Sequence, residues 1–280
     1  MRLVDYAKAH LVVVPIDAIG ALIAAGSVTI DGRVGRIDSR VDATATVEVE
    51  HAALKRILVP EPIPLAIVHE DDDLIVCDKP AGMHVHPLGL HRDGTLLGAL
   101  LWHCGARPDQ PWGRWRPHPL HRLDRAASGL IAIGKRAAVH EQVRQRFAEH
   151  AIERRYRAVV HGCVAGETGT IDAPLGRDPT CDYRRAVVPG GQRAVTHWQV
   201  LERERDRTWL ELTLETGRTH QIRAHLASIG HPIVGDTLYA TGRNAAAVIS
   251  LHAALLRMRH PRTGKPVTWT SANKVQRLDV

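Results

Sequence analysis

Three prolines within five residues, Pro60-Glu61-Pro62-Ile63-Pro64, place the strongest constraint on how this chain can fold. Proline has no backbone N–H and a fixed backbone angle, so the segment can continue neither a helix nor a central strand. We therefore predict a linker here, with a domain boundary near residue 58. The 280 residues suffice for a small domain, 1–58, and a large domain, 59–280.

The excess of positive over negative charge lies entirely on the larger domain. Residues 1–56 hold seven basic and seven acidic residues, so the remainder holds 30 basic residues against 23 acidic ones. Most of the basic residues are arginines, whose planar side chains bind phosphate well, and this favours a polyanionic partner held by the larger domain. A basic enzyme without a nucleic-acid partner explains the charge equally well.

Four cysteines, Cys77, Cys104, Cys163 and Cys181, lie far apart and form no Cys-x-x-Cys pair. A chain of this length can bury a large core without disulfides, so we expect free thiols in a reducing compartment. No apolar run approaches the roughly 18 residues of a membrane helix. Residues 1–5 also lack the pattern of a signal peptide, and together these features predict a cytoplasmic protein with no membrane segment.

The spacing of apolar residues predicts short strands and a few helices in no strict alternation. Helices are expected over residues 16–25, 95–103 and 137–149, and strands over residues 27–32, 44–50, 65–69, 74–76, 130–133, 156–160 and 208–214. This mixture favours an α+β architecture over a doubly wound sheet.

Residues 106–119 are expected to form a loop, in which Trp112 and Trp115 alternate with Arg114 and Arg116. Aromatic rings between guanidinium groups suit stacking on unpaired bases and binding of phosphates. It is at least as plausible that the tryptophans fold onto the body of the protein as a cover.

A first run with candidate chemistry is His121-Arg122-Leu123-Asp124-Arg125-Ala126-Ala127-Ser128-Gly129. The arginines on either side of Asp124 favour its charged form. Gly129 suggests a tight turn that presents Asp124 at the end of a loop, just before the predicted strand 130–133. From this run alone, an aspartate that holds its own loop by local hydrogen bonds is the better explanation.

A second run is Gly217-Arg218-Thr219-His220-Gln221-Ile222-Arg223. Thr219 is a suitable N-cap for a helix that ends at Gly230. Arg218 would then lie just before the helix N-terminus, where the helix dipole also favours an anion, and could hold a catalytic carboxylate there. Alternatively, Arg218 contacts a phosphate or the protein surface and has no catalytic partner.

Four histidines, His84, His86, His118 and His121, raise the question of a zinc site. No acidic or thiol partner stands at a ligand spacing from them, so no metal is expected.

Five motifs follow one another along the chain, and together they resemble the RluA family of pseudouridine synthases. They are residues 70–76 leading into 79–87, residues 121–129, residues 153–156, residues 217–226 and residues 230–236. The similarity extends from about residue 65 to the end, and an ordered set of motifs is far more specific than any one of them.

This resemblance implies an α+β fold with a mixed, largely antiparallel sheet flanked by helices over residues 59–280. It also implies isomerisation of uridine to pseudouridine in structured RNA, in ribosomal RNA more than in transfer RNA, without a cofactor or metal. We expect a monomer, since no heptad pattern or long exposed apolar helix is evident.

The resemblance also assigns roles to residues. Asp124 would be the nucleophile, Tyr156 would pack on the target base, and Arg218 would pair with Asp124. Residues expected to bind the substrate are His121, Arg122, Arg125, His220 and Arg223.

Two departures from the family pattern favour an alternative. Residues 22–32 resemble part of a small α-L RNA-binding domain of the ribosomal-protein type. Residues 9–32, however, contain no Lys or Arg where basic residues would be expected to contact RNA, which favours a degenerate form of this domain. Ala127 stands where relatives usually have threonine. The alternative is a catalytically weak or inactive RNA-binding or ribosome-assembly protein of the same fold; a metal-dependent hydrolase is a weaker one.

Overall fold

The computed structural model describes residues 1–10, 14, 16–50, 52–53, 58–87, 92–107, 113–148, 151–240 and 248–273. It divides into two compact units, each built from several chain segments, which are treated separately below. The first unit comprises Met1–Val76, Met83–Arg122 and Ala132–Gln142, and the second comprises Cys77–Gly82, Leu123–Ile131 and Val143–Val280. No helix among the described residues is long and apolar enough to cross a membrane.

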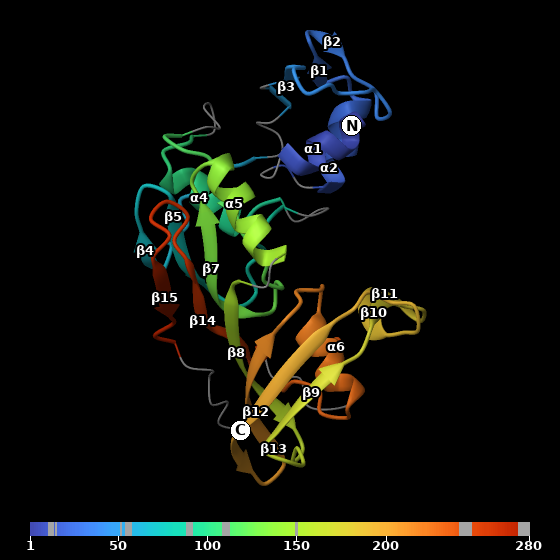
Figure 1. Cartoon of the computed structure of the whole chain (residues 1–280), viewed down its shortest axis with the longest axis vertical. Helices are drawn as coiled ribbons and strands as arrows, with labels where there is room; N and C mark the ends of the chain where they lie inside the picture. The colour runs from blue at the N-terminus through green and yellow to red at the C-terminus, as the bar shows by residue number, and fades with distance from the viewer. Residues whose placement is uncertain are drawn as a thin grey trace. The chain divides into compact units, whose positions relative to one another are not determined.

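The first unit begins with two helices, α1 (Leu3–His10) and α2 (Ile16–Ala24), which lie side by side (Figure 1). A three-stranded antiparallel sheet follows, in the order β2 (Arg33–Val34), β1 (Val28–Ile30) and β3 (Val47–Val49). These elements confirm the predicted helix over 16–25 and the strands within 27–32 and 44–50.

The apolar core of these elements includes residues from beyond the predicted linker. Ile19 of α2 and Val28 of β1 are buried in one cluster with Leu97 and Leu101 of α4 (Leu96–His103). Residues 58–66 lie in neither helix nor strand, as expected of the proline-rich segment. The boundary near residue 58 stays a prediction, because the small sheet and α4 share this core.

Helix α4 shows why its sequence folds as predicted. The hydroxyl of Thr95 accepts a hydrogen bond from the Gly98 backbone N–H at 3.0 Å, which satisfies one of the free N–H groups of the first turn. Six of its eight residues are buried, so its hydrophobic surface extends around most of the helix.

The predicted loop over residues 106–119 is only partly a loop. Residues His118–Pro119 form β6, which pairs antiparallel with β7 (Ser128–Gly134). Trp115 is half-buried against the core that α1 and α2 form, and its ring lies 5.2 Å from the Lys135 ammonium, so it acts as a cover. Trp112 lies outside the described residues.

The second unit contains most of the large sheet. Its strands follow the order β7, β14 (Leu251–Arg259), β8 (Glu153–His161), β13 (Arg207–Leu214), β12 (Val195–Glu204) and β9 (Thr168–Asp172), and β15 (Pro266–Thr270) pairs with β14. Every second residue of β13 is buried, as expected for a strand with one apolar face. The predicted strands over 156–160 and 208–214 are confirmed.

The remaining elements complete this α+β arrangement. Strands β10 (Leu175–Asp178) and β11 (Cys181–Val187) form a separate hairpin, and α6 (Gln221–Ser228) contacts β11 and β12. Strand β5 (Leu74–Lys79), strand β7 and helix α5 (Ala137–Ala148) each contribute residues to both units, and the first unit also contains β4 (Ile67–Glu70) next to β5. The predicted mixed, largely antiparallel sheet with flanking helices is confirmed.

The start of β7 is fixed to β14 by a parallel pairing that needs glycine. His252 lies opposite Ser128, and Ala253 lies opposite Gly129. Gly129 has a φ of 112°, and a Cβ atom there would lie 2.4 Å from the Ala253 carbonyl oxygen. No side chain fits this contact, so Gly129 determines how closely the segment after Asp124 approaches β14.

Replacement of Gly129 by alanine should therefore lower the free energy of unfolding by about 3 kcal/mol or more, through the positive φ and the collision with the strand. Gly105→Ala is the matched control, because Gly105 also has a positive φ, 97°, but faces open space. It should cost about 1 kcal/mol. Urea unfolding of both variants measures the difference, and equal losses would contradict the proposed collision.

Candidate active site

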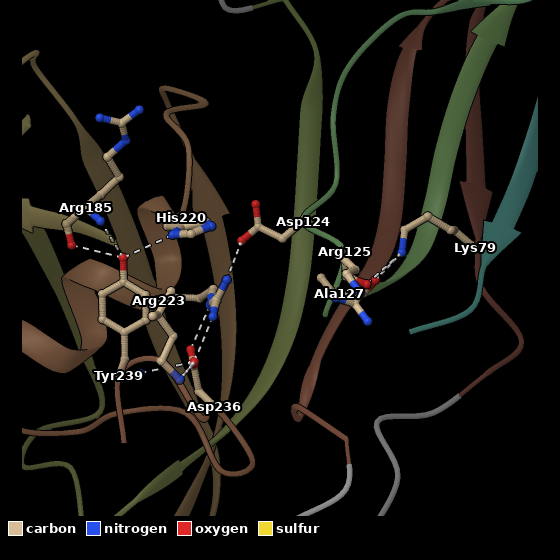
Figure 2. A network of polar contacts seen from close by, with 10 residues as sticks. Lys79, Asp124, Arg125, Ala127, Arg185, His220, Arg223, Asp236 and Tyr239 are labelled. Atoms are coloured by element: carbon tan, nitrogen blue, oxygen red, sulfur yellow. Dashed lines mark hydrogen bonds and ion pairs between the residues drawn. The ribbon is translucent and has the colours of Figure 1, made fainter. Parts of the chain in front are cut away.

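Asp124 lies in the second unit, four residues before β7 begins. Its side chain is 22% exposed, and its Oδ2 atom accepts a hydrogen bond from Arg223 Nη1 at 3.3 Å. Arg223 is on the first turn of α6, 99 residues further along the chain. Figure 2 shows this pair at the edge of a larger polar network.

Arg223 is held in place by a second carboxylate. Its Nε and Nη2 atoms donate to the two oxygens of Asp236 at 2.7 and 2.8 Å, and the Asp236 side chain is fully buried. Burial acts against the charge of Arg223, but the hydrogen bonds and charge of Asp236, followed by the charge of Asp124, outweigh it and raise the Arg223 pKa. A fixed, permanently charged guanidinium therefore faces Asp124.

Tyr239 connects this pair to the β10–β11 hairpin. Its ring centre lies 5.1 Å from the Arg223 guanidinium, and its backbone N–H donates to Asp236. Its hydroxyl donates to the Arg185 carbonyl and accepts from the Arg185 N–H, both at 2.9 Å. Burial raises the pKa of Tyr239 to about 12, so it is a neutral hydrogen-bonding group at physiological pH.

His220, a predicted substrate-binding residue, belongs to the same network. Its Nδ1 atom lies 3.3 Å from the Tyr239 hydroxyl (Figure 2). Burial lowers its pKa, while the charge of Asp124 acts in the opposite direction. The net lowering favours the neutral imidazole near Asp124 at physiological pH.

The start of α6 differs from the prediction. Thr219 is not the N-cap; His220 takes this position in a left-handed conformation, φ 56°, and makes no side-chain cap hydrogen bond. Instead, Gln221 Oε1 accepts from the Arg218 N–H at 3.0 Å and from the Thr216 hydroxyl at 2.7 Å. Its amide also donates to the Val195 carbonyl of β12, so a buried glutamine fixes this turn.

The predicted pairing of Arg218 with Asp124 is wrong. Arg218 is exposed, and its Nε donates to the Arg193 carbonyl at 3.1 Å. Within the described parts of the chain Arg218 forms no ion pair with Asp124, and Arg223 takes that position. The left-handed turn at His220 separates the two arginines, so that only Arg223 is carried by the helix itself.

Tyr156 lies on β8 and is 5% exposed. Burial raises its pKa, and the charge of Asp124 adds to this, whereas a hydrogen bond and the charge of Arg154 act in the opposite direction. Tyr156 is therefore a neutral phenol close enough to feel the Asp124 charge. The packing of Tyr156 on a target base stays a prediction.

Sequence reasoning missed Lys79, at the end of β5. Its side chain is almost fully buried, and Nζ donates to the carbonyls of Ala127 at 2.6 Å, Pro80 at 2.9 Å and Arg125 at 3.4 Å (Figure 2). Burial lowers its pKa to about 8, although the charge of Asp124 opposes this. The lysine thus holds the loop after Asp124 through backbone carbonyls.

The other predicted substrate-binding residues are more dispersed. Arg125 is exposed, and its Nε donates to the Gly82 carbonyl at 3.2 Å. His121 and Arg122 belong to the first unit, where His121 Nε2 accepts from the Ala132 N–H at 3.1 Å and Arg122 is exposed. Of the predicted residues, the structure gathers Asp124, Tyr156, His220 and Arg223.

Comparison with known proteins gives one consistent result. A family model described as RNA pseudouridylate synthase matches residues 73–228. The chain is 42% identical over 219 residues to ribosomal large subunit pseudouridine synthase D of Zymomonas mobilis, covering 74% of this chain and 69% of that protein. It is 39% identical over 262 residues to the protein of the same name from Pseudomonas aeruginosa, covering 88% and 80%.

A solved structure supports the fold. Human RNA pseudouridylate synthase domain containing 1 superimposes with a TM-score of 0.63 at 24% identity, covering 76% of this chain and 85% of that one.

Lys79→Met should lower the free energy of unfolding by about 2–3 kcal/mol, because buried carbonyls lose their donor. This loss should grow between pH 8 and 10.5. In that range Lys79 is protonated in the unfolded chain but mostly neutral in the folded one, so the unfolding free energy of the wild type rises by up to about 1.4 kcal/mol per pH unit. The variant has no lysine at this position and lacks this rise. Urea unfolding across this range measures both effects. Exposed Lys265→Met is the control and should change stability by less than about 0.5 kcal/mol; a Lys79 loss independent of pH would contradict the lowered pKa.

Proposed function

The chain belongs to the RNA pseudouridylate synthase family, and from this premise we propose that it isomerises uridine in ribosomal RNA of the large subunit, with Asp124 as the nucleophile. Formation of pseudouridine in RNA follows from the family. The choice of ribosomal RNA rests on the names of the relatives, and the residue roles rest on the geometry of the site. The pairing of Asp124 with a doubly anchored Arg223 carries this proposal.

The site has the groups that this isomerisation needs. The Asp124 carboxylate attacks, and the glycosidic bond between the ribose and the ring nitrogen of uracil breaks. The uracil turns, one of its ring carbons bonds to the same ribose carbon, and the bond that Asp124 formed to the uridine breaks, which releases the carboxylate. That ring carbon loses its proton while the nitrogen gains one. Atoms and charge balance without an external oxidant or reductant.

The neighbours of Asp124 support distinct parts of this reaction. Arg223 holds the carboxylate in one orientation, which lowers the entropic cost of the attack. Tyr156 offers an apolar ring with a neutral hydroxyl, suited to packing on uracil and to assisting the proton transfer. The target uridine must leave its stack to reach them, and the excess of arginine suits the phosphates beside it.

Ala127 does not favour the alternative of an inactive RNA-binding protein. Its contribution to the loop is a backbone carbonyl held by Lys79 at 2.6 Å, and alanine supplies this group as well as threonine does. We propose that the loop geometry is retained, and that Arg125, Arg122 and His121 contact the RNA around the target. The absence of a cofactor and the monomeric state remain part of the proposal.

Mapping of pseudouridine in cellular RNA tests the proposed function. RNA from cells with and without the gene is treated with a pseudouridine-specific adduct, and reverse-transcription stops are compared. We expect at least one stop in large-subunit ribosomal RNA to depend on the gene, to return with the wild-type chain, and to stay absent with Asp124→Asn, whose rate should fall at least about 1000-fold. Asp206→Asn, at an exposed turn, is the control that should restore the stop; identical maps with and without the gene would refute the enzyme.

A comparison of two arginines tests the role of the ion pair. The Arg223 guanidinium makes two hydrogen bonds to Asp236 and one to Asp124, and in Arg223→Lys a single ammonium group cannot reproduce this geometry. We therefore expect kcat to fall about 10- to 100-fold with a smaller change in KM. Arg218→Lys keeps an exposed charge and should leave kcat nearly unchanged. Single-turnover assays on the mapped RNA measure both, and a larger effect at Arg218 would restore the original assignment.

A further inference from the structure

A cavity of about 530 Å³ lies in the second unit, at the ends of β8, β13 and β14 and beside the last turn of α5. This volume falls within the range of sites that bind small ligands. Residues that line it include Phe147, Arg154, Leu214, Met258, Arg259 and Pro266. Nothing in the reaction proposed above uses it.

The cavity adjoins the proposed active site through one residue. Arg154 lines the cavity and precedes Tyr156 by two residues on β8, so both side chains lie on the same face of the strand. The Arg154 guanidinium also lies close to Gly217, because a Cβ added there would be 2.9 Å from Arg154 Nη1. An occupant of the cavity would therefore be a near neighbour of a base packed on Tyr156.

Arg154 offers a flat cationic surface. Its Cζ atom lies over the Phe147 ring, 5.0 Å from the ring centre, so the ring packs against the guanidinium within cation–π distance. Its Nε is buried and has no hydrogen-bond partner, and Arg154 forms no ion pair with a carboxylate among the residues that the structure describes. A guanidinium plane backed by an aromatic ring is a stacking surface for an unpaired base.

The charges around the cavity favour an anion. Its carboxylates already have cationic partners: Glu153 accepts from Arg155 at 2.6 Å and from Arg257 at 3.1 Å, and Glu215 accepts from Arg193 at 2.9 Å. Arg259, like Arg154, has no carboxylate partner within the described ranges, and it is exposed to solvent. The positive charge that remains is suited to a phosphate.

We propose that this cavity binds one nucleotide that flanks the target uridine, with its base on the Arg154 and Phe147 stack and its phosphate near Arg259. The inference rests on the proposed function, because it assumes that the target base packs on Tyr156. Binding of the flanking nucleotide would hold Arg154, and through it Tyr156, in one position. Binding would then depend on a second unstacked base as well as on the target uridine.

Binding of RNA hairpins with and without the flanking base tests the proposal. The full chain with Asp124→Asn, which blocks turnover, is titrated against a fluorescent hairpin with one loop uridine, and against hairpins with an abasic position before or after it. We expect one of the two abasic hairpins to bind about tenfold more weakly, the scale of one lost base stack. Equal affinity for all three would overturn the proposal.

Two further substitutions locate the effect. Phe147→Leu keeps an apolar side chain but removes the ring, so in this background the abasic penalty should shrink to about twofold; an undiminished penalty would place the base elsewhere. Arg259→Gln should weaken binding of the intact hairpin and reduce its salt dependence, whereas Arg205→Gln removes an exposed charge outside the cavity and should not. Equal effects of the two arginine substitutions would contradict a phosphate at Arg259.

The same hairpins keep this inference distinct from the proposed function. If the wild-type chain converts the uridine but binds the abasic hairpins as tightly as the intact one, nucleotide binding in the cavity is refuted and the proposed enzyme activity is retained. If an abasic position weakens binding in a way that depends on Phe147, but no uridine is converted, the proposed enzyme activity is refuted and the nucleotide site is retained. Circular dichroism of each variant confirms that the fold is retained.

Discussion

The buried ion pair between Arg223 and Asp236 determines where the other polar groups of the site can lie. A buried guanidinium is costly unless its donors are satisfied, and Asp236 satisfies two of them. A third donor, on Nη1, points to Asp124, which is more exposed and so remains accessible to a substrate. Asp236 in turn accepts from the N–H groups of Leu238 and Tyr239, which brings the tyrosine ring against the guanidinium.

Much of the fold was predictable because apolar periodicity is a local property. The helix over residues 16–25, the buried helix capped by Thr95 and the alternating strand β13 were read from the spacing of their side chains. The β10–β11 hairpin was not, because most of its side chains are half-buried or exposed and its few buried positions give little periodic signal. The short strand β6 was missed for a related reason: two residues give no period, and only pairing with β7 defines the strand.

The site shows the same division between local and distant information. The motifs of the sequence led to the predicted roles of Asp124 and Tyr156, but the sequence reasoning assigned the ion pair to Arg218. That assignment assumed a helix starting at Thr219, where propensity favours a threonine cap. Gln221 overrides this preference because its buried amide bonds to Val195, 26 residues away, and no local rule reports such a contact. Lys79 was missed likewise, since its carbonyl partners come mainly from a loop 46 to 48 residues later.

The hydrogen bonds between Tyr239 and the β10–β11 hairpin use only the backbone of Arg185, through its N–H and its carbonyl, while the Arg184 guanidinium lies over the Tyr239 ring at 5.8 Å. Any residue except proline offers both groups, so the link does not depend on the side chain at position 185. Other side chains of β11 are exposed: those of Asp182, Tyr183 and Val187, with Tyr183 at 86%. The exposed part of this hairpin can therefore change during evolution while the hydrogen bonds of Tyr239, and with them the ion pair of Arg223 and Asp124, are kept.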